Sequence, residues 1–446
     1  VYRVVWNGHV PDEYRLLSNR VSKLVNQPQP QAAWTRQELA KLRTTMGDEW
    51  GTALRGILAE QRNEARFRLR AMEMLGLYGP VPNEDLLQQL ATDPDPVIRE
   101  RAIRMISWRP SSRLAAAAVR GLSDEQARIR RAACETLTHI GHAVSWKSFA
   151  QSLESSSRTE ALAARRLLES IPVDQWRDEI MEAENIRVFL HGATALMIVE
   201  PSLPNAYRVL ARVSSIMEGF VNDRDFADLL RVTELAMIRG AVDPGKIPVF
   251  HDRILAEFPT GNGILNRELS RIIGYLKDER VADQIETYLS SSDSDQDKLQ
   301  VVLNFRTIAQ TFTDQQRMSV IKYLERMKTN TTAKESNYGL YLDNLLQSWS
   351  AEVSESQISE ILQNGAQWPS AALTAFYQLP EALTEEQVDW ISEMDRKLKG
   401  RIDATAQQAR IGCLAILGRS GDDKSMYYLR EVWRHEPERR NDVVLA

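Results

Sequence analysis

The chain has 446 residues, of which 43% are hydrophobic and 26% charged, a composition that excludes a disordered chain. Its formal net charge of -5 gives no overall basic field, which disfavours nucleic-acid binding. The two distant cysteines, Cys134 and Cys413, exclude a disulfide framework and a C-x-x-C pair. The sequence contains no apolar run of about 18 residues that would predict a membrane span, and its first residues lack a signal-peptide pattern.

The first residues differ in kind from the rest of the chain. Residues 1–6 are β-branched and aromatic and are followed by Asn7 and Gly8, which predicts a short extended strand. A lone strand needs partners to be stable, so residues 1–22 are expected to be the terminal strand and linker of a preceding domain. Because the chain begins at Val1 and ends within the apolar run 443–446, we interpret it as a fragment of a longer protein.

A period of 31 residues organises the segment 23–200. The recurring positions are Ala71, Ala102, Ala133, Ala164 and Ala195; Leu75, Ile106, Leu137, Leu168 and Val199; Phe67, Ile98 and Ile129; and Arg68, Arg99 and Arg130. A fixed period of this length indicates a repeat architecture in which each unit packs on its neighbours. The fold class predicted is therefore all-α, an α-solenoid of paired helices.

Within one repeat, the two helices and the turn between them can be placed. The apolar residues of 98–106 recur at i, i+4, i+5 and i+8, which gives one helix an apolar face. Residues 86–90 supply the preceding helix, and Pro94 and Pro96 end one helix and begin the next. The alanines permit close helix approach, so we interpret the alanine column as repeat core.

Charged residues in the turns give the pattern a family resemblance. Asp93 precedes Arg99 by six residues, and Asp124 precedes Arg130 by six. This resembles HEAT repeats, and the resemblance implies that these four residues form a structural ladder between neighbouring units. Ala161 replaces the arginine in the next unit, so the ladder is expected to be short and to serve structure rather than binding.

Beyond residue 200 the period blurs while amphipathic helices continue, which predicts degenerate repeats over 201–446. The expected helices are 226–238, 266–276, 281–289, 299–312, 317–327 and 411–417. Two of them, those containing Gly274 and Gly418, are expected to end at glycine and an acidic turn.

A second resemblance rests on the first forty residues. Residues 1–8, the segment 24–28 (LVNQP) and Trp34, Arg36 and Ala40 are similar to the middle region of the exported planctomycete-type proteins known as membrane-bound dehydrogenases. In that family HEAT repeats join a β-propeller to a haem domain, so the resemblance implies an exported or membrane-associated parent protein. The chain has no C-x-x-C-H motif and none of the propeller's catalytic residues, so no cofactor is expected here.

Other candidate sites favour structural interpretations. His139 and His142, with Cys134 upstream, suggest a metal site, but Gly141 is expected to end the helix and separate the two imidazoles. The remaining histidines stand alone, and neither paired carboxylates nor the turn 259–263 has the spacing of a catalytic or phosphate-binding motif.

Arginine and tryptophan are the residues that could form a binding surface. The arginine clusters are Arg62, Arg66, Arg68 and Arg70; Arg128, Arg130 and Arg131; and Arg165 and Arg166. Some of the ten tryptophans, among them Trp108, Trp146, Trp176, Trp349, Trp368, Trp390 and Trp433, could be exposed anchors for a protein, although most are expected in the core.

Three hypotheses on function follow. The first is a non-catalytic scaffold that binds a protein or sibling domains of the same polypeptide. The second is the solenoid segment of an exported sugar or alcohol dehydrogenase, linking a propeller to a c-type cytochrome domain. The third is a HEAT-like nucleic-acid-binding protein or glycosylase, which would need an acid and aromatic pocket that the sequence does not reveal.

Overall fold

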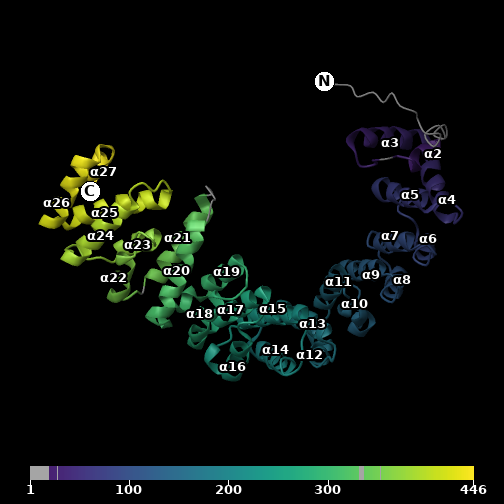
Figure 1. The fold of residues 1–446 in the computed structure, drawn as a ribbon. Coiled ribbons are helices and arrows are strands. Elements are labelled where there is room, and N and C mark those ends of the chain that lie inside the picture. Colours follow the sequence, from purple (N-terminus) through teal and green to yellow (C-terminus); the bar gives the residue numbers. More distant parts are fainter. Residues whose placement is uncertain (1–19, 28, 331–335, 352) are drawn as a thin grey trace. The chain divides into compact units, whose positions relative to one another are not determined.

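The computed structural model describes residues 20–27, 29–330, 336–351 and 353–446. This described part consists of helices joined by turns and holds no β-strand (Figure 1), which confirms the predicted all-α solenoid. The strand predicted for residues 1–6 lies outside the described residues. The helix α2 (Arg20–Val25) begins within the segment 1–22, whose last residues were predicted to be linker.

The chain forms two compact units. The first comprises Val1–Arg212 with Leu235–Ala241, and the second comprises Val213–Glu234 with Val242–Ala446. Two helices, α14 (Leu203–Ile216) and α15 (Asp223–Arg239), contribute residues to both units.

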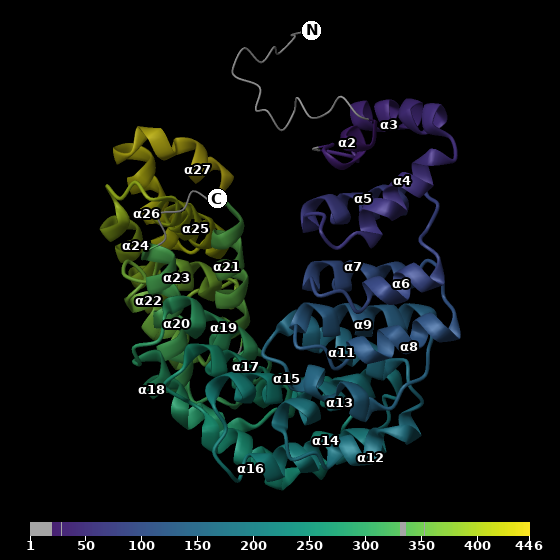
Figure 2. The ribbon, with the colours of Figure 1, turned by 90° about the vertical axis from the view of Figure 1, so that its right-hand side faces the viewer.

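In the first unit, short and long helices alternate along the chain. After α2 and α3 (Ala33–Met46), the first helices of the pairs are α4 (Glu49–Ala59), α6 (Glu84–Leu90), α8 (Ser112–Gly121), α10 (Ala150–Glu154) and α12 (Arg177–Met181). Two 3-10 turns, Trp146–Phe149 and Val173–Gln175, precede α10 and α12. The second helices are α5 (Ala65–Tyr78), α7 (Pro96–Ile106), α9 (Ala127–Ile140), α11 (Arg158–Glu169) and α13 (Ile186–Val199). Each second helix packs on the next, so α5, α7, α9, α11 and α13 form one row (Figures 1 and 2).

The second unit continues the pairing with less regular helices. They are α16 (Pro248–Glu257), α17 (Gly263–Leu276), α18 (Ile285–Leu289), α19 (Asp295–Phe305), α20 (Asp314–Asn330), α21 (Ser336–Ser350), α22 (Glu355–Gln363), α23 (Pro369–Phe376), α24 (Glu385–Leu398), α25 (Ala404–Ser420), α26 (Asp423–His435) and α27 (Arg440–Leu445). Four 3-10 segments lie between them: Pro244–Lys246, Glu279–Gln284, Arg306–Thr311 and Pro437–Arg439. Within this unit α17 packs on α19, and α21, α23 and α25 pack in succession.

Local sequence signals explain the helix boundaries of the regular repeats. The Asn83 side chain accepts a hydrogen bond from Leu86 N at the start of α6, and Asp95 caps α7, where Pro96 is the first residue. The helix α9 ends at Gly141, whose φ of 66° lies in the left-handed region that favours glycine. The predicted end of this helix is therefore confirmed.

Two expectations for the second unit need correction. The helix α17 ends at Leu276, the predicted residue, but its C-cap is Lys277 in the left-handed conformation rather than a glycine, and Gly274 lies inside the helix. At Gly274 a Cβ atom would lie 2.8 Å from the Asn304 backbone oxygen, so the glycine permits close approach of α19. The helix predicted over 299–312 is α19 followed by a 3-10 segment, because Ile308 has a non-helical φ of -123°.

Candidate functional site

The charged turn residues predicted from the sequence lie between successive second helices. The Arg99 side chain pairs with Asp124 of the next repeat, with Nε to Oδ2 at 2.9 Å, and also donates to the carbonyl oxygens of Asp93 and Pro94. Arg130 pairs with Glu160 of the following repeat at 2.6 Å and donates to the Asp124 and Glu125 carbonyls. Each guanidinium thus closes its own turn and joins the next repeat.

The ladder is longer than the sequence spacing indicated. Arg68, which has no aspartate six residues before it, forms a two-point ion pair with Asp93 and donates to the Leu58 carbonyl. At the other end Glu160 takes the place of an aspartate and also accepts a hydrogen bond from Ser155. The side chains of Arg68 and Asp93 are only 4% and 2% exposed, so this pair is core structure.

The alanine column lies in the core of the same repeats. Ala71, Ala102, Ala133, Ala164 and Ala195 are all 0% exposed. A Cβ atom placed on Gly121 of α8 would lie 3.2 Å from the Ala133 Cβ, so these small residues bring neighbouring helices together. Val199 differs from the other members of its column because it is the last residue of α13, where it is 37% exposed.

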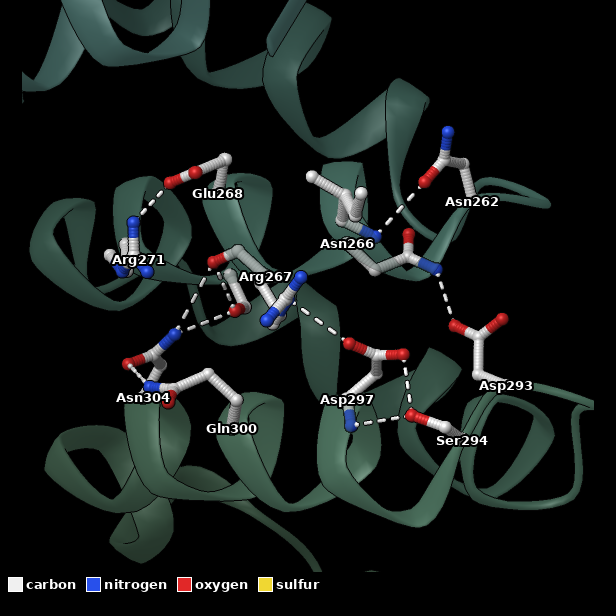
Figure 3. A network of polar contacts seen from close by, with 12 residues as sticks. Asn262, Asn266, Arg267, Glu268, Arg271, Asp293, Ser294, Asp297, Gln300 and Asn304 are labelled. Atoms are coloured by element: carbon white, nitrogen blue, oxygen red, sulfur yellow. Dashed lines mark hydrogen bonds and ion pairs between the residues drawn. The ribbon is translucent and has the colours of Figure 1, made fainter. Parts of the chain in front are cut away.

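The second unit carries a modified form of the ladder between α17 and α19 (Figure 3). Asn266 occupies the same fourth helical position as Arg68, Arg99 and Arg130, and donates to Asp293 Oδ2 at 2.9 Å. Asn304 donates to the Arg267 carbonyl and to Ser270 Oγ, at 3.4 and 2.8 Å. This continuation is not visible in the sequence, because asparagine replaces arginine and the 31-residue period is lost.

Next to this network, two glutamates and two arginines form a partly buried cluster. Glu268 accepts from Arg231 at 3.1 Å and pairs with Arg271, whose Nη1 also lies 3.8 Å from Glu234 Oε1. Burial, together with the neighbouring Glu268 carboxylate, raises the pKa of Glu234 to about 7.

The raised pKa of Glu234 predicts how the stability of the fold changes with pH. Between the ordinary glutamate pKa of 4.5 and about 7, the folded chain holds more protons than the unfolded chain, so stability falls as the pH rises through this range. We expect Glu234→Gln to remove this slope and to raise the free energy of unfolding at pH 8 by about 1 kcal/mol, after allowance for partial exposure. Denaturant unfolding of both proteins at pH 5 and pH 8 checks this, and equal slopes would contradict it.

A row of exposed or half-buried arginines lies on the solvent-accessible side of the second helices of the first unit. We call Arg70, Arg101, Arg104, Arg128, Arg131, Arg165 and Arg166 the guanidinium row. The 31-residue period extends to this surface, because Glu73, Arg104, Glu135 and Arg166 form one column of alternating charge. This surface column was not predicted with the core columns, although it follows the same 31-residue register.

Glu135 and Glu169 in the guanidinium row each bind two arginines. Glu135 accepts from Arg131 Nε at 2.6 Å and from Arg104 of the neighbouring repeat. Burial of Glu135 opposes ionisation, but the hydrogen bonds from Arg131 and Arg104 outweigh it and lower the pKa. In α11, Glu169 likewise pairs with both Arg165 and Arg166, at 3.2 and 2.7 Å. Each of these carboxylates has one negative charge for two guanidinium groups, so part of the positive charge of the arginines is not compensated.

Exposed apolar side chains accompany the guanidinium row. Trp108 is 48% exposed, and Leu77 and Leu162 are each 44% exposed. A Cβ atom on Gly76 would lie 2.7 Å from the Trp108 ring, so this glycine lets the indole lie over α5. The Arg101 guanidinium lies 5.9 Å from the centre of the same ring.

The other arginines and tryptophans fall into distinct environments. Arg68 and Arg130 belong to the buried ladder, whereas Arg62 and Arg66 are exposed before and within α5. Trp50, Trp176 and Trp349 are buried, and Trp34 and Trp433 are exposed. The remaining tryptophans singled out from the sequence, Trp146, Trp368 and Trp390, are half-buried.

The histidine and cysteine positions hold no ligand set. His139 is exposed, and Cys134 is buried, with burial raising the pKa of its thiol to about 12. Among the residues that the structure describes, no three His, Cys, Asp or Glu side chains are grouped to hold a metal ion. In the same part of the chain, no helix is both long and apolar enough to cross a membrane.

Comparisons with known proteins agree with the fold. HEAT repeats match residues 83–169. The crystal structure of Kap121p is similar with a TM-score of 0.50 and 10% identity, over 97% of this chain and 51% of Kap121p. Importin beta gives a TM-score of 0.50 with 10% identity, over 93% of this chain and 63% of its own length. No curated protein matches the sequence.

These likenesses define the class of protein. The chain is an α-solenoid of HEAT-like repeats, and it spans about half the length of the Kap121p structures that it matches. At this level of identity the structural likeness shows the fold alone. One of the similar structures, again with a TM-score of 0.50, is Kap121p bound to Ste12p, so a solenoid of this fold binds a protein in that case.

Proposed function

We propose that this chain is a non-catalytic helical-repeat scaffold that binds a protein, or a sibling domain of the same polypeptide, through the second helices of its first unit. The observation that carries the proposal is the solvent-accessible surface of α5, α7, α9 and α11. It combines an exposed tryptophan, exposed leucines and a row of arginines. Tryptophan and arginine are the residues that most often dominate binding energy at protein interfaces.

The fold supports this proposal in a second way. In a solenoid each repeat contacts only its neighbours, so the row of second helices offers an extended surface to a partner. The buried ladder and the buried alanine column stabilise the stacking of the repeats. The exposed side chains of the second helices are therefore available to bind a partner.

Site-specific cross-linking tests the proposal. A photoreactive amino acid at Leu162 on α11 should cross-link the partner in cells, whereas the same residue at Ala116, exposed on the first helix α8, should not. Mass spectrometry of the cross-linked band identifies the partner or the sibling domain. The absence of a protein cross-link at Leu162, or an equally strong cross-link at Ala116, would contradict the proposal.

The dehydrogenase context is a second proposal, with support from sequence alone. Residues 1–8 and 24–40 carry the resemblance, and the repeat match at 83–169 is equally expected of a solenoid outside that family. The coding sequence on either side of this chain tests it. A β-propeller upstream and a C-x-x-C-H motif downstream would support this context, and their absence would contradict it.

A further inference from the structure

The guanidinium row carries more positive charge than its own carboxylates balance. Its seven arginines lie among only four glutamates, Glu73, Glu100, Glu135 and Glu169, and three of these bind two arginines each. The charge is also segregated along the chain. Residues 1–212 contain 29 Lys and Arg against 25 Asp and Glu, whereas residues 213–446 contain 27 against 36. A ligand for this surface is therefore expected to be acidic.

Two members of the guanidinium row are the best placed to meet such a ligand. Arg128 is exposed, and its closest carboxylate, Glu100, is 3.9 Å away, beyond hydrogen-bonding distance. Arg101 lies beside the Trp108 ring, where a ligand carboxylate could meet the guanidinium next to an apolar surface. Neither residue takes part in the buried ladder, so both can change without disturbing the repeat stacking.

Apolar side chains lie at both ends of the row. Leu77 and Trp108 lie on α5 and just after α7, and Leu162 lies on α11. Leucine and tryptophan bind apolar side chains of a polypeptide, whereas the sugar-phosphate backbone of a nucleic acid offers no such partner away from its bases. The combination of arginines with apolar residues at both ends thus favours a protein segment over a nucleic acid.

The repeat spacing sets the form of this segment. Adjacent packed helices are about 8–10 Å apart. A polyproline II segment advances about 9 Å in three residues, so every third side chain can face the next second helix of the row. From α5 to α11 this corresponds to about ten residues.

Resting on the proposed function, we propose that the guanidinium row binds an extended acidic segment of a partner protein, with a carboxylate at every third residue and apolar residues at both ends. The acidic side chains meet the Arg101, Arg128 and Arg131 region, and the apolar ends contact Trp108 and Leu162.

Fluorescence anisotropy with the full chain tests this assignment. The probe is a labelled proline-rich peptide of about twelve residues, with Glu at every third position and Leu at both ends. We expect saturable binding that weakens as salt rises. Arg101→Glu with Arg128→Glu should weaken binding at least about tenfold, and Trp108→Ala by a similar factor. The matched control, Arg113→Glu with Arg120→Glu on α8, should change it less than about twofold.

The comparison probes separate two kinds of failure. A peptide with Lys in place of Glu, and duplex DNA, are titrated in parallel. No saturable binding of the acidic peptide, or equal loss in the control variant, would overturn the assignment. Preferential binding of the Lys peptide would also overturn it while leaving the protein-binding scaffold intact. Preferential binding of DNA would overturn both the assignment and the proposed function.

Discussion

Replacing Asp93 with alanine is expected to lower the free energy of unfolding of the regular repeats by about 3–5 kcal/mol. The carboxylate is 2% exposed and forms a two-point ion pair with Arg68, which is itself 4% exposed. Removing it leaves the guanidinium buried with only the Leu58 carbonyl as a partner. Hydrogen exchange of the full chain measures the effect, as loss of protection in α5 and α7.

An exposed ion pair nearby gives the matched control. Asp85→Ala removes the partner of Arg113, but these two side chains are 76% and 55% exposed, so the change should be below about 0.5 kcal/mol. Replacing Arg68 with methionine in the Asp93→Ala protein should restore much of the loss, because no buried charge then remains. If Asp93→Ala and Asp85→Ala had equal effects, the ladder would not stabilise the stacking.

The second large effect is expected at Asp395, near the end of α24. Its carboxylate is 0% exposed and accepts hydrogen bonds from Tyr428, Arg410 and Arg439, which come from three other elements. The Asp395→Ala change leaves two guanidiniums together without this acceptor, with only Glu436 between them. We expect a loss of about 3–5 kcal/mol, seen as faster exchange in α24, α25 and α26.

The same helix provides the comparison for this second prediction. Asp389 on α24 pairs with Lys424, and the two side chains are 63% and 41% exposed. Asp389→Ala should therefore cost less than about 0.5 kcal/mol. Similar destabilisation by Asp389→Ala and Asp395→Ala would show that Asp395 is not the centre of a stabilising network.

The regular repeats could be predicted from the sequence because their core positions recur in register. The alanine column places the second helix of each pair, and Pro94 and Pro96 mark the turn of one pair, without any tertiary information. The ion pairs were less accessible, since Arg68 and Asp93 are 25 residues apart and belong to successive repeats. The six-residue spacing within one turn indicates which aspartate and arginine belong to the ladder. It does not indicate which residue of the neighbouring repeat each of them binds.

The second unit was harder to predict for physical reasons. Short 3-10 segments, such as Arg306–Thr311, change the spacing between helices and remove a fixed period. Asn266 fills the ladder position with a neutral side chain, so a search for charged pairs does not find it. Trp108 and five arginines of the guanidinium row could be singled out from the sequence, but not the single surface that they share. The exposure of Trp108 depends on Gly76 of the preceding repeat, a contact that appears only in the fold.

Hydroxyl-radical footprinting of the full chain with the Glu-containing probe peptide tests whether the second helices of the first unit bind the partner, because it measures the exposure of individual side chains. We expect that Trp108, Leu77 and Leu162 become protected, whereas Trp34 and Trp433, which are exposed outside the guanidinium row, do not change. Protection of Trp34 or Trp433 without protection of Trp108 would contradict the claim that the second helices of the first unit bind the partner.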